Sequence, residues 1–183
     1  MNPPEGDLTL QGTESRSPAL VRIPVGVVVE RCEAESPWLP FLSRPVAVLA
    51  GVPTAAPWTV IRSDRDVTLF FAGQAVIELY RTETANYRDN LASGTPSLWV
   101  VLRPTSTEGQ FDLLMVTADP AEGEALTGVG NDLVEAVPMP LPISEILERF
   151  ITEHHVDLPF FKRRRDRSGA RSPASGAGSE EEG

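Results

Sequence analysis

The sequence predicts an α+β domain, in which a mainly antiparallel curved sheet or partial barrel carries a short central helix and a packed C-terminal helix. Two observations predict this fold class. Short segments that alternate apolar and polar residues recur between turn residues along much of the chain, as is typical of antiparallel strands. Near the end of the domain, apolar residues recur instead at the spacing of one helix face, and such a face must pack against the sheet.

The N-terminal half of the domain is expected to form strands. In residues 21–33 valines alternate with other residues, and the Ser-Pro-Trp sequence at 36–38 ends this first strand. The polar residues 63–66 favour a turn between two of the later strands. Those later strands are expected at residues 44–51, 57–62, 67–73 and 75–81.

Residues 82–94 are expected to form the short central helix. Thr82 can cap its N-terminus, and Gly94 can end it. Tyr87 and Leu91 are four residues apart, so they share the face that packs on the sheet.

The second half of the domain continues with strands. Segments 96–104 and 111–118 are apolar on both faces, so both are expected to be central strands, joined as a hairpin. Residues 119–126 are expected to make a helical turn, and 132–137 the last strand. The prolines within 138–142 predict a stiff, extended connector.

The final helix has the clearest pattern. Its apolar residues fall on one face and are Ile143, Ile146, Leu147, Phe150 and Ile151. Counted at about 100° per residue, His154 lies within this face and His155 at its margin. Adjacent residues do not share a face, and neither a cysteine nor a third histidine is available, so the pair is a poor metal clamp. We expect a packed, hydrogen-bonded His154, and no metal or cofactor.

Length and composition predict one domain with two tails. The chain has 183 residues, which suits a single domain, expected at 21–162. Residues 1–20 are rich in Pro, Gly, Ser and Thr, and 163–183 are basic and then low in complexity, so both are expected to be disordered. The sequence shows neither a signal-peptide pattern nor an apolar run long enough to span a bilayer, which predicts a cytoplasmic protein without membrane contact.

The net charge of −10 is unevenly distributed. Residues 1–161 carry a net charge of −12, residues 162–171 carry +5, and the final residues carry −3. An acidic body repels nucleic acid, and only the basic tail would attract it. Nucleic-acid binding is therefore not the expected function.

No catalytic residue is predicted. Cys32, the only cysteine, would need a neighbouring base to form a thiolate, and both histidines lie far along the chain. In the loop 48–58, Gly51 is followed by Val52 and Pro53, where a phosphate-binding loop would need consecutive glycines. A nucleotide site is therefore not expected there.

The segment HHVDLPFFKRRRDR at 154–167 is expected to dock on a protein partner, because an aromatic pair beside basic residues suits a docking peptide. The predicted partner-binding residues are Phe160, Phe161, Lys162, Arg163, Arg164 and Arg165. Other interpretations stay open. The phenylalanines can fold back onto the domain, and the basic run can be a solvated tail or a contact with nucleic acid.

A second set of candidate residues is Arg44, Arg62 and Arg103, which stand at strand ends. They could meet an anionic ligand in the mouth of a curved sheet, or they could be scattered surface arginines. The three tryptophans are expected in the core or at its rim, with a ligand-lining role for one of them as the alternative.

Several segments together resemble a family of small bacterial proteins known only as a domain of unknown function. The segments are PVGVVVER (24–31), SPW (36–38), RPVAVL (44–49), PWTVIR (57–62), ELYRTETANYRDNLAS (78–93), PSLWVVLRP (96–104), VPMP (137–140) and HHVDLPFFKRRRDR (154–167). Genes of that family often lie near those for molybdenum-dependent formate dehydrogenases and their maturation factors. The resemblance therefore implies a context of maturation or assembly, and it supplies no catalytic residues.

Two functional hypotheses follow. The first is a non-enzymatic accessory protein that assists maturation or assembly of a molybdenum-dependent, formate dehydrogenase-type oxidoreductase by binding one of its subunits or another maturation factor. The second is a domain that binds a small molecule or the molybdenum cofactor, with modification of that cofactor as its enzymatic form.

Overall fold

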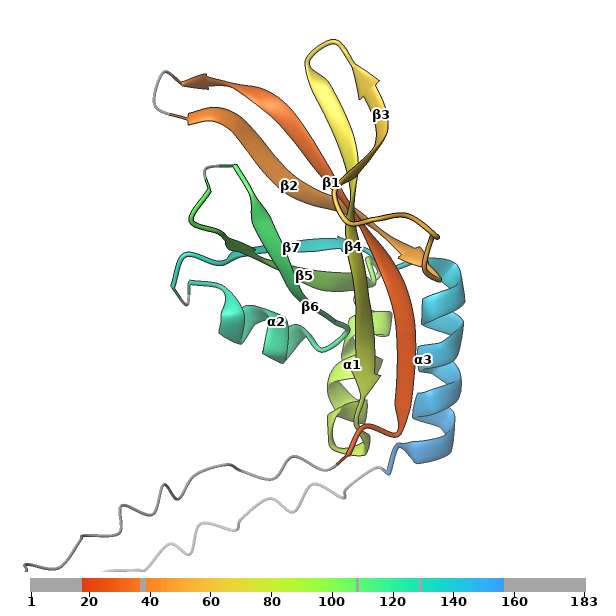
Figure 1. Ribbon diagram of the computed structural model, residues 1–183. Coiled ribbons are helices and arrows are strands. Elements are labelled where there is room, and N and C mark those ends of the chain that lie inside the picture. Colours follow the sequence, from red (N-terminus) through yellow and green to blue (C-terminus); the bar gives the residue numbers. More distant parts are fainter. Residues whose placement is uncertain (1–17, 37–38, 108, 129, 157–183) are drawn as a thin grey trace, which may run out of the picture.

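The computed structural model describes residues 18–36, 39–107, 109–128 and 130–156, which form an α+β fold of two antiparallel sheets with helices packed around them (Figure 1). The fold class predicted from the sequence is confirmed, and the two sheets do not close into a barrel. The elements are β1 (Val21–Ser36), β2 (Leu39–Ala50), β3 (Thr59–Asp64), β4 (Val67–Leu79), the 3-10 turn η1 (Arg81–Glu83), α1 (Thr84–Ala92), β5 (Ser97–Pro104), β6 (Phe111–Thr117), α2 (Pro120–Leu126), β7 (Leu133–Pro138) and α3 (Leu141–His154).

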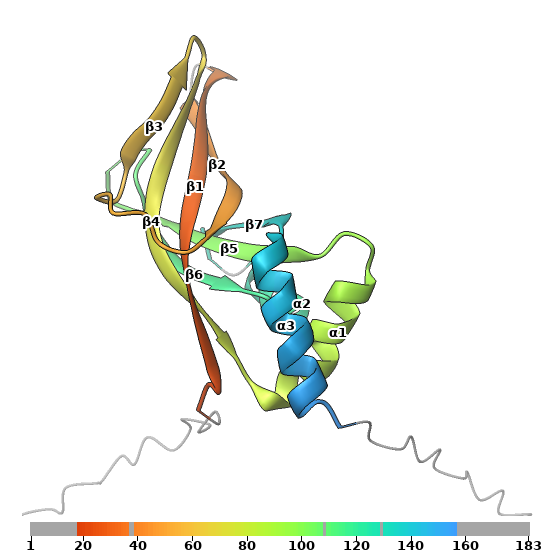
Figure 2. The same cartoon turned by 90° about the vertical axis from the view of Figure 1, so that its right-hand side faces the viewer.

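The first sheet has the strand order β2-β1-β4-β3 and is built on the long central pair β1 and β4. One residue of this pair is unmatched, because Val27 pairs with Gly73 and Val28 pairs with Phe71, which leaves Ala72 as a bulge. A bulge bends a strand and increases its twist. The bend falls where the sheet divides into an upper part, with β2 and β3 at its edges, and a lower part of β1 and β4 beside the helices (Figures 1 and 2).

The loop of residues 51–58, called the strap below, crosses the first sheet. It must do so because β2 and β3 lie at opposite edges of that sheet. Gly26 on β1 makes room for the crossing, since a Cβ atom there would lie 2.9 Å from both Phe71 and Pro53. A larger residue at position 26 would push the strap away from the sheet.

The second sheet has the order β6-β5-β7, so β5 is central and β6 is an edge strand. The prediction that residues 111–118 form a central strand is therefore wrong. Leu114, one of the residues that made this segment apolar on both faces, is 43% exposed. Helix α2 covers the sheet at Trp99, and Gly123 allows this contact, because a Cβ atom on it would overlap the indole ring.

One hydrophobic core joins both sheets to α1 and α3. Helix α3 lies beside α1 along the lower part of the molecule (Figure 2). Three residues of the α3 face predicted from the sequence, Ile143, Leu147 and Phe150, are buried in this core and are at most 2% exposed. Other fully buried residues of this core are Val25, Val27, Val29, Ile77, Leu79, Leu98, Val100 and Leu102.

Several boundaries differ from the sequence prediction. The expected strands 67–73 and 75–81 are one strand, β4, because Gly73 pairs with Val27 next to the bulge at Ala72 and does not end the strand. Thr82 does not cap α1, which starts after the 3-10 turn with Glu83 at its N-cap. Pro142 lies in the first turn of α3, where a missing N–H costs nothing.

The two histidines end α3 in different surroundings. The ring of His154 packs against Phe150 with centroids 4.7 Å apart, and its side chain is 28% exposed. His155 is hydrogen-bonded to α1: Arg88 Nη1 donates to its Nε2 at 2.8 Å, and its Nδ1 lies 3.0 Å from Thr84 Oγ1. An arginine can only donate, so Nδ1 carries the proton. His155 therefore ties the end of α3 to α1.

Tyr87 gives the stability a defined dependence on alkaline pH. Burial raises the pKa of Tyr87 from 10.0 to about 12. The hydrogen bond from the backbone N–H of Tyr80 lowers this pKa, and the nearby carboxylates of Asp119 and Glu83 raise it. Because the folded pKa is the higher one, the stabilisation is complete below about pH 10 and is lost as the pH rises towards 12.

We expect the free energy of unfolding to fall by roughly 2–3 kcal/mol more across this window than it does in Tyr87→Phe. Urea unfolding of both proteins at a series of pH values measures this difference. An identical pH dependence of the two would contradict it.

Candidate functional site

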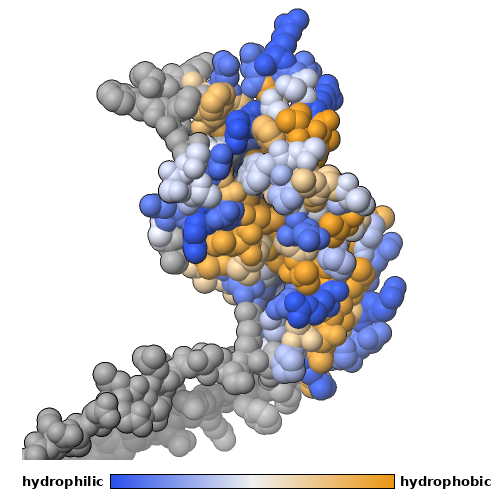
Figure 3. Space-filling model, in the orientation of Figure 1, coloured by the Kyte–Doolittle hydropathy of each residue, from blue (hydrophilic) through white to orange (hydrophobic). Residues whose placement is uncertain are grey.

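The strongest candidate site is a groove between the upper part of the first sheet and the end of the β5–β6 hairpin. We call it the Arg31 groove. It encloses about 310 Å³ and is lined by Arg31, Trp58, Phe70, Thr105, Gln110, Phe111 and Asp112. Figure 1 shows the hairpin reaching towards the upper half of β1 and β2, and Figure 3 shows hydrophobic surface at the waist between the two sheets.

Strand pairing places the polar and aromatic groups of the groove on one face of the first sheet. Side chains alternate between faces along a strand, and directly paired residues share a face. Arg31 pairs with Ser43 on β2 and with Thr68 on β4, and Phe70 lies two residues beyond Thr68. The same pattern sends Cys32 to the opposite face.

The Arg31 guanidinium lies close to two aromatic rings. Its central carbon lies 4.8 Å from the ring centre of Phe70 and 5.9 Å from that of Phe41, within the range of cation–π contacts. Its Nη2 donates to the carbonyl of Gly109 at 2.7 Å, and its Nε donates to Ser43 Oγ at 3.4 Å. Among the residues that the structure describes, none of its contacts is with a carboxylate.

Trp58 enters the groove from the end of the strap with an unusual backbone. Its φ is 62°, in the left-handed region that a bulky side chain rarely adopts. The conformation is held by a 2.6 Å hydrogen bond from its N–H to the carbonyl of Phe71. It sets the indole against Phe70, with ring centroids 6.1 Å apart. Strain of this kind gathers at functional sites and motivates a functional interpretation.

The opposite wall of the groove comes from the β5–β6 hairpin. Thr105 N–H donates to the carbonyl of Gln110 at 3.0 Å, which closes the loop. Gly109 has a φ of 73°, so this position favours glycine, and its carbonyl accepts from Arg31. Asp112, on β6, also borders the groove. The groove thus combines a cation with an aromatic surface.

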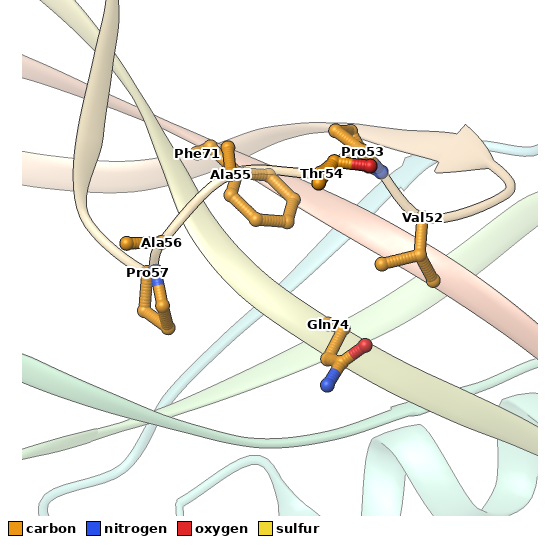
Figure 4. Close-up of a pocket in the computed structure, with 8 residues that line it drawn as sticks. All are labelled: Val52, Pro53, Thr54, Ala55, Ala56, Pro57, Phe71 and Gln74. Atoms are coloured by element: carbon orange, nitrogen blue, oxygen red, sulfur yellow. The ribbon is translucent and has the colours of Figure 1, made fainter.

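A second cavity of about 310 Å³ lies under the strap. Figure 4 shows its lining, in which Gln74 and Phe71 of β4 face the residues of the strap. The lining has no charged side chain, and its polar side chains are Thr54 and Gln74. This cavity has few polar groups that could orient a ligand, so the Arg31 groove is the better candidate.

Two of the three arginines predicted for an anionic ligand lie on the face of the first sheet opposite the groove. The pairing sets Arg44, Glu30, Leu69 and Arg62 in one row across the four strands. Arg44 and Arg62 are thus three strand spacings, or about 14 Å, apart. Arg44 is 2.9 Å from Glu30 Oε1, and Arg62 is 3.2 Å from Asp64 Oδ2.

The third arginine, Arg103, lies on the second sheet and is paired with Asp132. Its Nε and Nη2 donate to the two carboxylate oxygens at 2.8 and 2.7 Å. This hydrogen bonding lowers the pKa of Asp132 and raises the pKa of Arg103. The structure therefore does not bring the three arginines together, and a carboxylate accompanies each of them.

The other predicted sites can be placed only in part. The predicted docking residues, 160–165, lie outside the described residues. The described residues end just after α3, and the C-terminal end of α3 lies at the end of the domain opposite the β3–β4 hairpin (Figures 1 and 2). Within the described ranges no three or more His, Cys, Asp or Glu side chains gather as a metal site would require. In the same ranges no helix is both long and apolar enough to cross a membrane.

Comparison with protein families decides the relationship. Residues 24–165 match the model of a family described as Protein of unknown function (DUF3305). The chain belongs to this family. The match covers every strand and helix of the described domain except the first residues of β1, so the DUF3305 domain includes the whole Arg31 groove. No curated protein and no solved structure shows a detectable match to the chain.

Sequence reasoning missed the role of Arg31 in this DUF3305 domain. The residue appeared only as the end of a valine-rich strand. One signal was present, since an arginine near the end of an otherwise apolar strand needs a partner on its face of the sheet. Trp58 was recognised as a residue of the core, its rim or a ligand site, and the structure places it in the groove.

Proposed function

We propose that the protein is a non-enzymatic accessory protein that binds a protein partner through the Arg31 groove. The observation that carries the proposal is the composition of the groove. Arginine and tryptophan are enriched among the residues that dominate binding energy at protein interfaces, and Phe70 and Phe111 extend the aromatic surface beside them. Arg31 and Trp58 are held in place by contacts within the protein, which lowers the entropic cost of ordering them on binding.

The partner we propose is an oxidoreductase subunit or a maturation factor of the molybdenum-dependent, formate dehydrogenase type, bound in the cytoplasm. The support is the resemblance of the chain to proteins encoded beside such enzymes. In this proposal the segment 160–165 is a second docking element, because its aromatic and basic residues complement an acidic partner surface. The groove supplies the specific contact, and the basic segment adds attraction at a distance.

Affinity purification of the tagged protein from its native cells, grown on formate and followed by quantitative mass spectrometry, tests the proposal. Four proteins are compared: the full chain, Arg31→Gln, Arg149→Gln and a chain that ends at Asp157. Arg149 is an exposed residue of α3, so its variant removes one positive charge away from the groove. We expect a molybdoenzyme subunit or maturation factor with the full chain and Arg149→Gln, and a strong loss with Arg31→Gln.

The shortened chain separates the two docking elements. It retains the whole described core, and reduced recovery with it would support a role for the segment 160–165. If recovery were equal with all four proteins, neither element would bind the partner and the proposal would be wrong.

A second candidate function is the binding of a small anionic aromatic molecule, such as a nucleotide or a pterin cofactor. The observation that favours it is the size of the groove, about 310 Å³, with aromatic rings beside a guanidinium. Thermal-shift measurements with nucleotides and molybdopterin test it. A saturable stabilisation that disappears in Arg31→Gln would favour this function over protein binding.

A further inference from the structure

The Arg31 guanidinium retains hydrogen-bonding capacity that the fold does not use. Arginine has five N–H donors, and the contacts to Ser43 and Gly109 occupy two of them. The remaining N–H groups belong to a half-buried cation that lies against Phe70 and has no carboxylate partner within the described residues. A partly buried positive charge of this kind attracts an anion strongly, because the surrounding apolar groups screen it less than water would.

The rest of the groove limits which anion fits. Trp58, Phe70 and Phe111 offer aromatic surface beside the guanidinium, which suits a flat or bulky apolar group. The groove therefore offers one positive position beside an aromatic surface.

We propose that the Arg31 groove recognises an acidic segment of its protein partner, in which an Asp or Glu carboxylate is followed closely by an aromatic side chain. The carboxylate accepts from the unused N–H groups of Arg31, and the aromatic ring lies against Trp58 and Phe70. This inference rests on the proposed function, because it names the chemistry of the partner at the same site.

Titration of the full chain with two short peptides tests the recognition. The probes are acetyl-Glu-Phe-Ala-Lys-amide and its matched analogue acetyl-Gln-Phe-Ala-Lys-amide. Nuclear magnetic resonance follows the Arg31 Nε–H and Trp58 indole N–H signals, with the latter assigned through Trp58→Phe. We expect saturable shifts of both signals by the glutamate peptide at millimolar concentration. The glutamine peptide should bind about tenfold more weakly or less, because hydrogen bonds to a charged group are the stronger ones.

Variants of the full chain locate the contact. Arg31→Gln should abolish the preference for glutamate, and Arg31→Lys should retain only part of it, because lysine lacks the planar fork that holds a carboxylate. Arg149→Gln should bind both peptides as the wild type does. Far-ultraviolet circular dichroism and thermal unfolding check that the Arg31 variants are folded.

The inference would be overturned by equal binding of the two peptides, by an unchanged preference in Arg31→Gln, or by the absence of any shift at millimolar concentration. A larger shift of the same signals by inorganic phosphate would also overturn it and would indicate a phosphate site. If native purification yields an Arg31-dependent partner while the glutamate peptide does not bind, the proposed function stands and only this inference fails. If the glutamate peptide binds but native purification yields no Arg31-dependent partner, the peptide recognition stands and the proposed function fails.

Discussion

Replacing Phe150 by alanine is expected to lower the free energy of unfolding by about 3–5 kcal/mol. Phe150 is 2% exposed in the interior of α3. Its ring meets Tyr87 edge to face with centroids 6.1 Å apart and lies 4.7 Å from the ring of His154. Removal of the ring would leave a cavity between α3 and α1. A domain of this size is stable by only about 5–15 kcal/mol, so the variant should be close to unfolding.

Urea unfolding followed by circular dichroism measures the effect of Phe150→Ala. The matched control is Phe41→Ala, which removes the same ring from a residue that is 45% exposed. We expect the control to lose about 1 kcal/mol. Equal losses in the two variants would contradict the position of α3 in the core.

Replacing Asn90 by alanine is expected to cost about 3 kcal/mol, although the residue is polar. Asn90 is 4% exposed, and its side chain joins α1 to β5 and to the residue that follows β6. Its Nδ2 donates to the carbonyls of Ser97 and Ala118 at 2.8 and 2.9 Å, and its Oδ1 accepts from Ser97 N–H at 3.0 Å. The alanine variant leaves these backbone groups without their partner, and each buried one carries a desolvation penalty.

A control and a second variant separate hydrogen bonding from side-chain size. Asn131→Ala changes an exposed asparagine and should stay within about 0.5 kcal/mol of the wild type. Asn90→Asp preserves the shape but replaces the two N–H donors with an oxygen that faces two carbonyls, so it should destabilise the protein at least as much as Asn90→Ala does. Wild-type stability of Asn90→Asp would show that these hydrogen bonds contribute nothing.

The parts of the fold that the sequence predicted depend on local patterns. The burial of Ile143, Leu147 and Phe150 follows from helical spacing alone. The turn between β3 and β4 was also visible, because polar residues separate two strand-like runs and Asp64 pairs with Val67 across it.

The parts that were missed depend on contacts between distant segments. A glycine such as Gly73 usually weakens a strand, yet Gly73 pairs with Val27 of β1, and β4 continues past it with a bulge at the neighbouring Ala72. The apolar pattern of β6 suited a central strand, but no strand pairs with its outer side. The division into two sheets depends on which strand ends meet, and local periodicity does not encode that.

The candidate site was missed for the same reason. The Arg31 groove combines residues from β1, the strap, β4 and the β5–β6 hairpin, so no short sequence motif could predict it. The arginines chosen from the sequence, Arg44, Arg62 and Arg103, were expected at strand ends, but in the structure Arg44 lies within β2 and Arg62 within β3. The structure separates them from Arg31, because each of these three is ion-paired with a carboxylate, whereas Arg31 has no such ion pair with any residue that the structure describes.

The central claim is that the Arg31 groove binds a protein partner. The most direct test measures how much molybdoenzyme subunit or maturation factor co-purifies from native cells with Arg31→Gln. This amount is divided by the amount recovered with the wild type, and the ratio is compared with the same ratio for Arg149→Gln. We predict a ratio of about one tenth or less for Arg31→Gln, as expected for loss of an interface residue that dominates binding, and a ratio close to one for Arg149→Gln. Equal ratios for the two variants would contradict the claim.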